Sequence, residues 1–223
     1  MCGRYTVSAG HEALARAFLA EFADELKESW KPRYNITPGS GVVAILEDRD
    51  KGGRKADVLH WGLVPAWAKD VNIGYKLINA RAETIAEKPA FRAAARERRC
   101  LIPASGFYEW TKDADGNRLP WYIHPTDGDL LAFAGVWQTW DKGEEPLTTC
   151  AIVTTGANET MSKIHHRMPV VLRAEDWPLW LGEAGKGAAT LMTAAAEGAL
   201  AFHRVDRAVN SNRASGPALI EAI

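Results

Sequence analysis

Short apolar segments with the composition of β-strands dominate the second half of the chain, and they limit the folds it can adopt. Five such segments follow one another: Leu101–Ser105, Phe107–Trp110, Trp121–His124, Leu130–Trp140 and Thr148–Thr154. Asp115-Gly116-Asn117 and Asp127-Gly128 lie between them and are typical of tight hairpin turns. Strands joined by hairpins lie antiparallel, so the pattern favours an α+β fold over a strictly alternating βαβ fold.

Helical patterns lie before and after this β-rich part. Within residues 11–28 an apolar side chain recurs at every fourth position, which predicts one amphipathic helix. Further helices are expected over Pro89–Arg99 behind a Thr84–Glu87 capping box, after Asp176, and from near Lys186 to Gly198. Further strands are expected at Gly41–Glu47, Asp57–Trp61 and Ala201–Val205. The fold class predicted is a single α+β domain over residues 1–223, with a curled, mainly antiparallel sheet or barrel and peripheral helices. Periodicity leaves the strand order open.

Composition excludes several classes of protein. The 223 residues carry a net charge of −1, so a globally basic nucleic-acid binder is excluded, whereas a local basic patch is not. No apolar run approaches the ~20 residues of a membrane span. The three cysteines, Cys2, Cys100 and Cys150, have neither the number nor the spacing of a disulfide framework or a zinc site, so a cytoplasmic protein without metal or cofactor is expected.

The first candidate for chemistry is Met1-Cys2-Gly3. Removal of Met1 would leave Cys2 with an α-amine and a thiol on neighbouring carbons, whose reference pKa values of ~8 and ~8.5 make both partly nucleophilic near neutrality. Such a 1,2-aminothiol can form a Schiff base with an aldehyde and then close a thiazolidine ring, or attack an acyl group as a thiolate. Gly3 leaves room for a substrate to approach the backbone. Taken alone, Cys2 is better explained as a cysteine without function.

Two further segments carry polar groups suited to catalysis. Glu109 lies between aromatic residues in a strand-like stretch, where burial would raise its pKa and suit it to general acid–base work. His165 and His166 are adjacent and would face opposite sides of a strand, so they are poor joint metal ligands, and one histidine is better suited to move protons. An exposed glutamate and an ordinary histidine are the alternatives.

The remaining candidates suit binding of an anion or a base. Asn79 and Arg81 lie two residues apart and face the same side of an extended segment, where the amide can orient a nucleophile and the guanidinium can bind a phosphate. Arg167 follows the histidine pair and is a second anion ligand. Trp67, in a loop bounded by Pro65, can stack on a nucleobase. Each has an ordinary structural alternative: a solvated arginine, a turn asparagine or a core tryptophan.

Together and in this order, these signals resemble the motif series of the SRAP family (SOS response-associated peptidases, also called abasic site processing proteins). The motifs are Met1-Cys2-Gly3-Arg4-Tyr5, Arg33-Tyr34-Asn35-Ile36-Thr37-Pro38, Trp61-Gly62-Leu63-Val64-Pro65, Ile78-Asn79-Ala80-Arg81, Gly106-Phe107-Tyr108-Glu109-Trp110 and Ile164-His165-His166-Arg167-Met168-Pro169. The resemblance covers essentially the whole chain and ends with Val205–Asn210, where Asp206 replaces the serine common in the family.

The resemblance implies a sensor of abasic sites in single-stranded DNA that acts during the DNA damage response. Cys2 would cross-link to the deoxyribose aldehyde as a thiazolidine once a peptidase activity, possessed by the chain itself, has removed Met1. By resemblance, Glu109 and His165 form the acid–base pair and Asn79 orients Cys2 or the sugar. The residues expected at the DNA are Gly3, Arg4, Pro38, Trp67, Arg81 and Arg167. A monomer is expected, without membrane contact, cytoplasmic and associated with the nucleoid while bound to DNA.

Two other classes remain as alternatives. Amidotransferases with an N-terminal cysteine also begin Met-Cys-Gly, but their downstream His-Arg and Asn-Gly motifs are not found here in order. A non-catalytic single-stranded DNA module would use the tryptophans and arginines for salt-sensitive binding that is indifferent to Cys2.

Overall fold

The centre of the molecule is a small β-barrel. The computed structural model describes residues 2–128 and 130–223, and five of its strands form a closed ring in the order β11-β10-β7-β4-β5, because β11 also pairs with β5. Their bounds are β4 (Gly41–Glu47), β5 (Arg54–Trp61), β7 (Arg99–Ala104), β10 (Leu131–Trp140) and β11 (Leu147–Gly156). All neighbours in the ring are antiparallel except β11 and β5. The prediction of a curled, mainly antiparallel sheet or barrel is confirmed.

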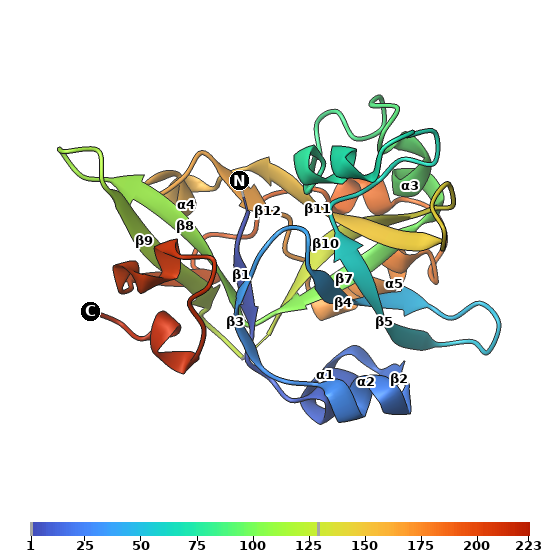
Figure 1. Cartoon of the computed structure of the whole chain (residues 1–223), viewed down its shortest axis with the longest axis horizontal. Coiled ribbons are helices and arrows are strands. Elements are labelled where there is room, and N and C mark those ends of the chain that lie inside the picture. Colours follow the sequence, from blue (N-terminus) through green and yellow to red (C-terminus); the bar gives the residue numbers. More distant parts are fainter. Residues whose placement is uncertain (1, 129) are drawn as a thin grey trace.

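A second sheet lies beside the barrel and has the order β13-β9-β8-β1-β3. Its strands are β1 (Tyr5–Val7), β3 (Arg33–Ile36), β8 (Gly106–Lys112), β9 (Arg118–Pro125) and β13 (Leu200–Arg204). The β8–β9 hairpin extends away from the body of the molecule at the left of Figure 1, with the C-terminal segment beside it. This sheet brings the start of the chain, in β1, next to β8, which carries Glu109.

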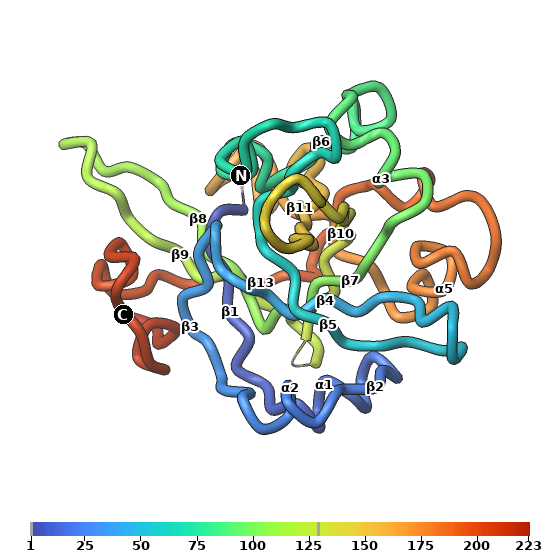
Figure 2. The backbone as a smooth tube through the Cα atoms, turned by 45° about the vertical axis from the view of Figure 1, so that its right-hand side comes forward, coloured from blue at the N-terminus to red at the C-terminus, as the bar shows by residue number. Residues whose placement is uncertain are grey.

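Three short strands complete the β-structure. β2 (Ala20–Phe22) and β12 (Arg167–Pro169) extend the larger sheet at its two ends, and β6 (Asn79–Arg81) runs parallel to β11. Figure 2 shows the N-terminal end of the chain between β8 on one side and β6 and β11 on the other. The predicted strands are present, and β4 has the predicted bounds, while the others agree to within a few residues at each end.

An aromatic cluster joins the two sheets and fixes the approach to β6. The rings of Trp61 and Phe133 both pack edge-on against the fully buried Tyr5, at centroid distances of 5.3 and 5.9 Å. The Trp61 indole donates a hydrogen bond of 2.9 Å to the carbonyl oxygen of Ile78, the residue before Asn79. The core therefore holds the backbone that presents Asn79.

The prediction of one helix over residues 11–28 is wrong. The segment is divided into α1 (His11–Phe18), β2 and α2 (Asp24–Ser29). Leu19 ends α1 in the left-handed region, with φ 51°, and the next three residues pair with β5. Phe22 is buried there against the barrel, so strand pairing outweighs the helical spacing of the apolar side chains.

Two more helices are shorter than predicted. Within Pro89–Arg99 only α3 (Arg92–Glu97) is helical, and Thr84–Glu87 forms turns that do not cap it. Between Lys186 and Gly198 there is only the 3-10 helix η3 (Ala188–Leu191). Gly185 and Gly187 both have positive φ, and a run of small side chains offers a helix little apolar area to bury, so this segment is mostly turns.

The remaining helices are short. The one predicted after Asp176 is present as α5 (Trp177–Leu181). The others are α4 (Glu159–Ser162) and the 3-10 helices η1 (Val71–Lys76), η2 (Ala174–Asp176), η4 (Arg207–Asn210) and η5 (Pro217–Ile220). Within residues 2–128 and 130–223, no helix has the length and apolar character needed to cross a membrane.

Gly106 is expected to be essential for the junction of β1 and β8. A Cβ atom at this position would lie 2.4 Å from the Tyr122 ring and 2.6 Å from the carbonyl oxygen of Ile123, closer than real Cβ contacts. Gly106→Ala should therefore lower the free energy of unfolding by about 1–3 kcal/mol, the usual cost of overpacking. Urea denaturation measures it, with Gly156→Ala as the control, because a Cβ at Gly156 has no atom within 4 Å. Equal midpoints for the Gly106 variant and the parent would contradict this prediction.

Candidate functional site

Cys2 is buried near the start of β1, close to β8 and β6. It precedes β1, whose position next to β8 is fixed by the hydrogen bond from the Tyr108 amide to the Arg4 carbonyl oxygen, 2.9 Å. The Asn79 side chain donates a hydrogen bond of 2.9 Å to the Cys2 carbonyl oxygen. The side chain of Cys2 is 0% exposed. Burial, and next the nearby Glu109 carboxylate, raise the pKa of the thiol, so the thiol stays protonated at neutral pH.

Asn79 has a second polar atom directed into the protein. Its Oδ1 atom is buried and accepts no hydrogen bond from any residue in the described part of the chain. Buried polar side-chain atoms are nearly always hydrogen-bonded, so an exception needs an explanation. An acceptor in this position suits a donor that arrives with a substrate.

Glu109 is a buried carboxyl group in β8. Only 4% of the residue is exposed, and burial raises its pKa to about 7. Both protonation states are therefore populated at neutral pH, as a general acid–base group requires. The expectation of a buried Glu109 with a raised pKa agrees with the structure.

His165 is the second titratable group near Cys2. Its Nδ1 atom lies 3.0 Å from the Arg167 amide nitrogen and 3.1 Å from the Arg167 carbonyl oxygen, so it accepts a hydrogen bond from the first or donates one to the second according to the tautomer. Burial lowers the pKa of His165, which favours the neutral form of the ring. The His166 ring stacks on it at 4.4 Å. At neutral pH the His165 ring is thus mainly neutral.

Two of these groups, Glu109 and His165, border one cleft. The cleft has a volume of about 340 Å³ and is lined by Gly3, Arg4, Glu109, Trp110, Thr111, Lys112, Arg118 and His165. Its walls come from the start of β1, from both strands of the β8–β9 hairpin and from the segment after α4. The structure therefore brings together Gly3, Glu109 and His165 next to the buried Cys2, although they are far apart in the sequence.

The predicted DNA ligands occupy different positions. Arg4 lines the cleft but is only 8% exposed, and its guanidinium donates to Asn35, Asn212 and the carbonyl oxygen of Val209. Arg167 is held by Glu83 through bonds of 2.6 and 2.9 Å and by the Thr154 carbonyl oxygen.

Among the described residues, four of the predicted DNA ligands do not line the cleft. Arg81 is exposed in β6, opposite Thr154 of β11. Trp67 is 55% exposed on its loop, as expected for a stacking residue, and Pro38 is partly buried in the turn after β3. Arg167 is the fourth.

Sequence reasoning missed several residues of the site. Trp110, Lys112 and Arg118 line the cleft, and the amides of Asn210 and Asn212 hold Trp110 and Arg4 in place. One signal was available: a hairpin centred on Asp115-Gly116 places residue 112 opposite residue 118. The asparagine contacts depend on the path of the C-terminal segment, which no local pattern indicates.

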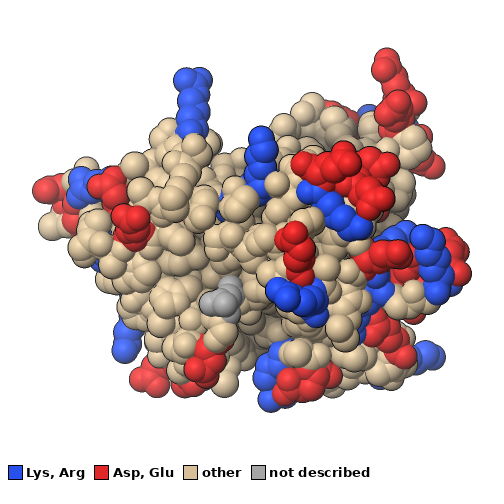
Figure 3. Space-filling view, turned by 90° about the horizontal axis from the view of Figure 1, so that it is seen from below, with Lys and Arg blue, Asp and Glu red and all other residues tan. Residues whose placement is uncertain are grey.

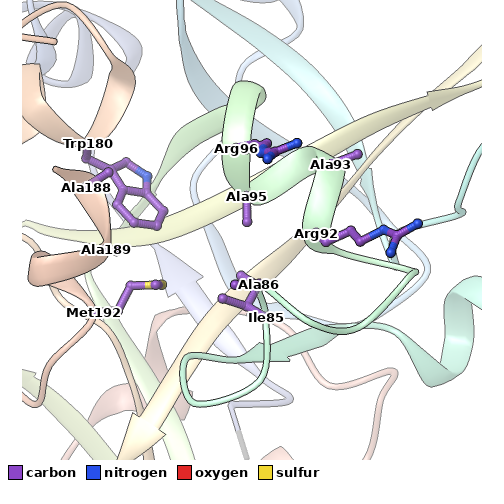
Figure 4. A pocket seen from close by; sticks show the side chains of 10 residues that line it. All are labelled: Ile85, Ala86, Arg92, Ala93, Ala95, Arg96, Trp180, Ala188, Ala189 and Met192. Atoms are coloured by element: carbon purple, nitrogen blue, oxygen red, sulfur yellow. The ribbon is translucent and has the colours of Figure 1, made fainter. Parts of the chain in front are cut away.

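Other surfaces carry less suitable chemistry. Figure 4 shows a larger cavity of about 610 Å³ between α3 and α5, lined by apolar side chains with Arg92 and Arg96 at its edge. None of the described residues that line it is a carboxylic acid, a histidine or a nucleophile. The face that includes α1 and α2, shown in Figure 3, mixes charges of both signs without an extended basic patch. Within the described residues no cluster of His, Cys, Asp and Glu could hold a metal ion.

Comparisons with known proteins agree on one family. The model of the family described as "SOS response associated peptidase (SRAP)" matches residues 1–212. The chain is 38% identical over 227 residues to the abasic site processing protein YoqW of Bacillus subtilis, with all of both chains covered. It is 32% identical to the abasic site processing protein HMCES of Gallus gallus, covering 97% of this chain and 76% of that protein. A crystal structure of a protein from Bacteroides thetaiotaomicron has the same fold, with a TM-score of 0.87, 25% identity and complete coverage of both chains.

Proposed function

The chain belongs to the SOS response associated peptidase (SRAP) family, and on this premise we propose that it processes abasic sites in single-stranded DNA by a covalent cross-link through Cys2. One observation carries the proposal: the buried Cys2 lies next to Glu109, whose pKa is about 7, and its carbonyl oxygen accepts a hydrogen bond from Asn79. An aminothiol beside an acid–base group is the arrangement that condensation with an aldehyde requires.

The proposal requires a free α-amine on Cys2. Hydrolysis of the Met1–Cys2 peptide bond consumes one water and releases Met1, and we assign this step to a peptidase activity of the protein itself. The amine and the thiol of Cys2 are then both available to one aldehyde carbon.

The cross-link forms in two additions. The Cys2 nitrogen attacks C1′ of the ring-opened deoxyribose, and the resulting carbinolamine loses one water to give an imine. The thiol sulfur then adds to the same carbon while its proton passes to the nitrogen, which closes a thiazolidine ring. The balance is one aldehyde and one aminothiol joined, with one water released.

Glu109 and His165 move the protons in these steps. Because burial keeps the Cys2 thiol protonated, its addition needs a base, and the ionised form of Glu109 lies close enough to influence the thiol. The protonated form of Glu109 assists the departure of water. His165 moves a proton as the deoxyribose ring opens to the aldehyde.

The other site residues position the substrate. The free acceptor atom of Asn79 receives a hydrogen bond from the Cys2 amine or from the sugar hydroxyl. Arg81 binds one flanking phosphate, and Arg167 binds another in place of the Glu83 carboxylate that holds it in this structure. Pro38 and Trp67 contact bases or sugars, and Gly3 leaves room for the deoxyribose. Arg4 contributes its charge from a fixed, mostly buried position.

A denaturing gel tests the proposal. A single-stranded oligonucleotide with one abasic site, mixed with protein confirmed by intact mass to lack Met1, should give a heat-stable band of lower mobility. The mass of the adduct should equal the sum of the two reactants minus one water. An intact oligonucleotide of the same sequence should give no such band. Absence of the adduct on protein that lacks Met1 would overturn the proposal.

A further inference from the structure

The cleft has an excess of positive charge. Three of its lining residues, Arg4, Lys112 and Arg118, are cationic, whereas Glu109 is the one carboxyl group among the described residues that line it and has a pKa of about 7. A cleft of this kind attracts an anion.

Arg4 is not the residue that would bind this anion. Its guanidinium already donates to two asparagine side chains and to a backbone carbonyl, and it is nearly buried. Through these hydrogen bonds it connects the start of β1 with the C-terminal segment. The unused cations of the cleft are therefore on the β8–β9 hairpin.

The guanidinium of Arg118 is available to an anion, and the Trp110 ring fixes its orientation. It is exposed, and within residues 2–128 and 130–223 its guanidinium forms no ion pair and no hydrogen bond. The group lies 4.4 Å from the centroid of the Trp110 ring. Trp110 is fixed in turn by a hydrogen bond of 2.6 Å from its indole nitrogen to Asn210. Stacking on a fixed ring leaves the N–H donors of a guanidinium at its edge, where they can bind a phosphate in bidentate fashion.

Lys112 adds a second charge at the same place. It pairs directly with Arg118 in the β8–β9 ladder, so the two side chains lie on one face of the hairpin. Like charges directly opposite one another are destabilising in a sheet, and an anion bound between them offsets that repulsion. The exposed pair at the projecting hairpin is thus a second indication of an anionic ligand (Figure 1).

We propose that Arg118, stacked on Trp110 and opposite Lys112, binds a backbone phosphate next to the abasic deoxyribose. This inference rests on the proposed function and adds the β8–β9 hairpin to the DNA-binding surface. The strand would then run along the hairpin wall of the cleft, with the lesion facing Glu109 and Cys2.

Equilibrium binding to an oligonucleotide with a tetrahydrofuran abasic analogue, which cannot form an imine, measures this contact without the chemistry. Arg118→Ala should weaken binding about tenfold at low salt and lower the slope of log K against log salt by ~0.7, the value for one phosphate contact on a single strand. Arg118→Lys should keep the slope and bind with intermediate affinity. Arg16→Ala, which removes an exposed arginine from α1, is the charge-matched control and should bind as the parent does.

Neutral methylphosphonate linkages beside the analogue identify the phosphate. One of the two flanking substitutions should weaken binding by the parent but have little further effect on Arg118→Ala, as expected when both changes remove the same contact. Unchanged affinity and slope for Arg118→Ala, while the parent still cross-links abasic DNA, would overturn this inference alone. A parent that neither binds nor cross-links abasic DNA would overturn the proposed function, and the inference with it.

Discussion

Replacing Cys2 with alanine is expected to abolish the heat-stable adduct with abasic DNA and to leave most of the DNA affinity. The variant keeps an α-amine after removal of Met1, so it can still form an imine, but it lacks the sulfur that closes the ring. An imine hydrolyses during denaturation, so the adduct should disappear from the gel. Treatment with borohydride before denaturation should recover a band, because reduction turns the imine into a stable amine.

The two other cysteines provide the control. Cys100 and Cys150 are also fully buried and have raised thiol pKa values, chiefly through burial, but they belong to barrel strands. Cys150→Ala should cross-link at the parent rate. A heat-stable adduct of Cys2→Ala, without borohydride, would mean that another nucleophile forms the bond and would remove Cys2 from its proposed role. Loss of DNA binding by Cys2→Ala would instead indicate that the thiol is needed for the structure of the cleft.

Much of the fold follows from local sequence because the β-strands carry their own signals. Alternating apolar residues and Asp-Gly turns mark the β8–β9 hairpin and its neighbours. The helix predictions are less accurate, because whether an amphipathic segment becomes a helix depends on the part of the structure against which its apolar face packs. Phe22 has helical spacing, yet its place against the barrel makes residues 20–22 a strand. Closure of the barrel by β5 and β11 joins strands far apart in the chain, which no local pattern can show.

The site was predictable in its residue types but not in its contacts. Glu109 between aromatic residues indicates burial, and burial accounts for its raised pKa. Arg4, in contrast, has the sequence context of an exposed cation, yet the C-terminal segment folds back and accepts hydrogen bonds from its guanidinium. The sequence does not single out Arg118 as an anion ligand, because that role depends on the Trp110 ring beneath its guanidinium and on Lys112 in the neighbouring strand.

Glu109→Gln is expected to slow adduct formation at pH 7 by ~10²–10⁴-fold, the usual contribution of a general acid–base group. The amide keeps the shape of the carboxyl group but can neither accept the thiol proton nor donate one to the departing water. Single-turnover gels measured from pH 5 to 9 should show an ionisation near 7 in the parent that is missing from the variant. Affinity for the tetrahydrofuran analogue should change little. Glu25→Gln, which removes an exposed carboxylate from α2, is the matched control.

The same substitution should stabilise the fold at high pH, which separates a catalytic defect from a folding defect. Burial raises the pKa of Glu109 from 4.5 to about 7, so the folded protein binds more protons than the unfolded chain between these values. The parent therefore loses stability as pH rises from ~4.5 to ~7, up to roughly 3 kcal/mol, and the neutral amide avoids this loss. Urea denaturation should show the variant more stable than the parent at pH 8 and similar to it at pH 4. A slow variant that is also less stable at pH 8 would mean that Glu109 supports the cleft as an anion, and its acid–base role would fail.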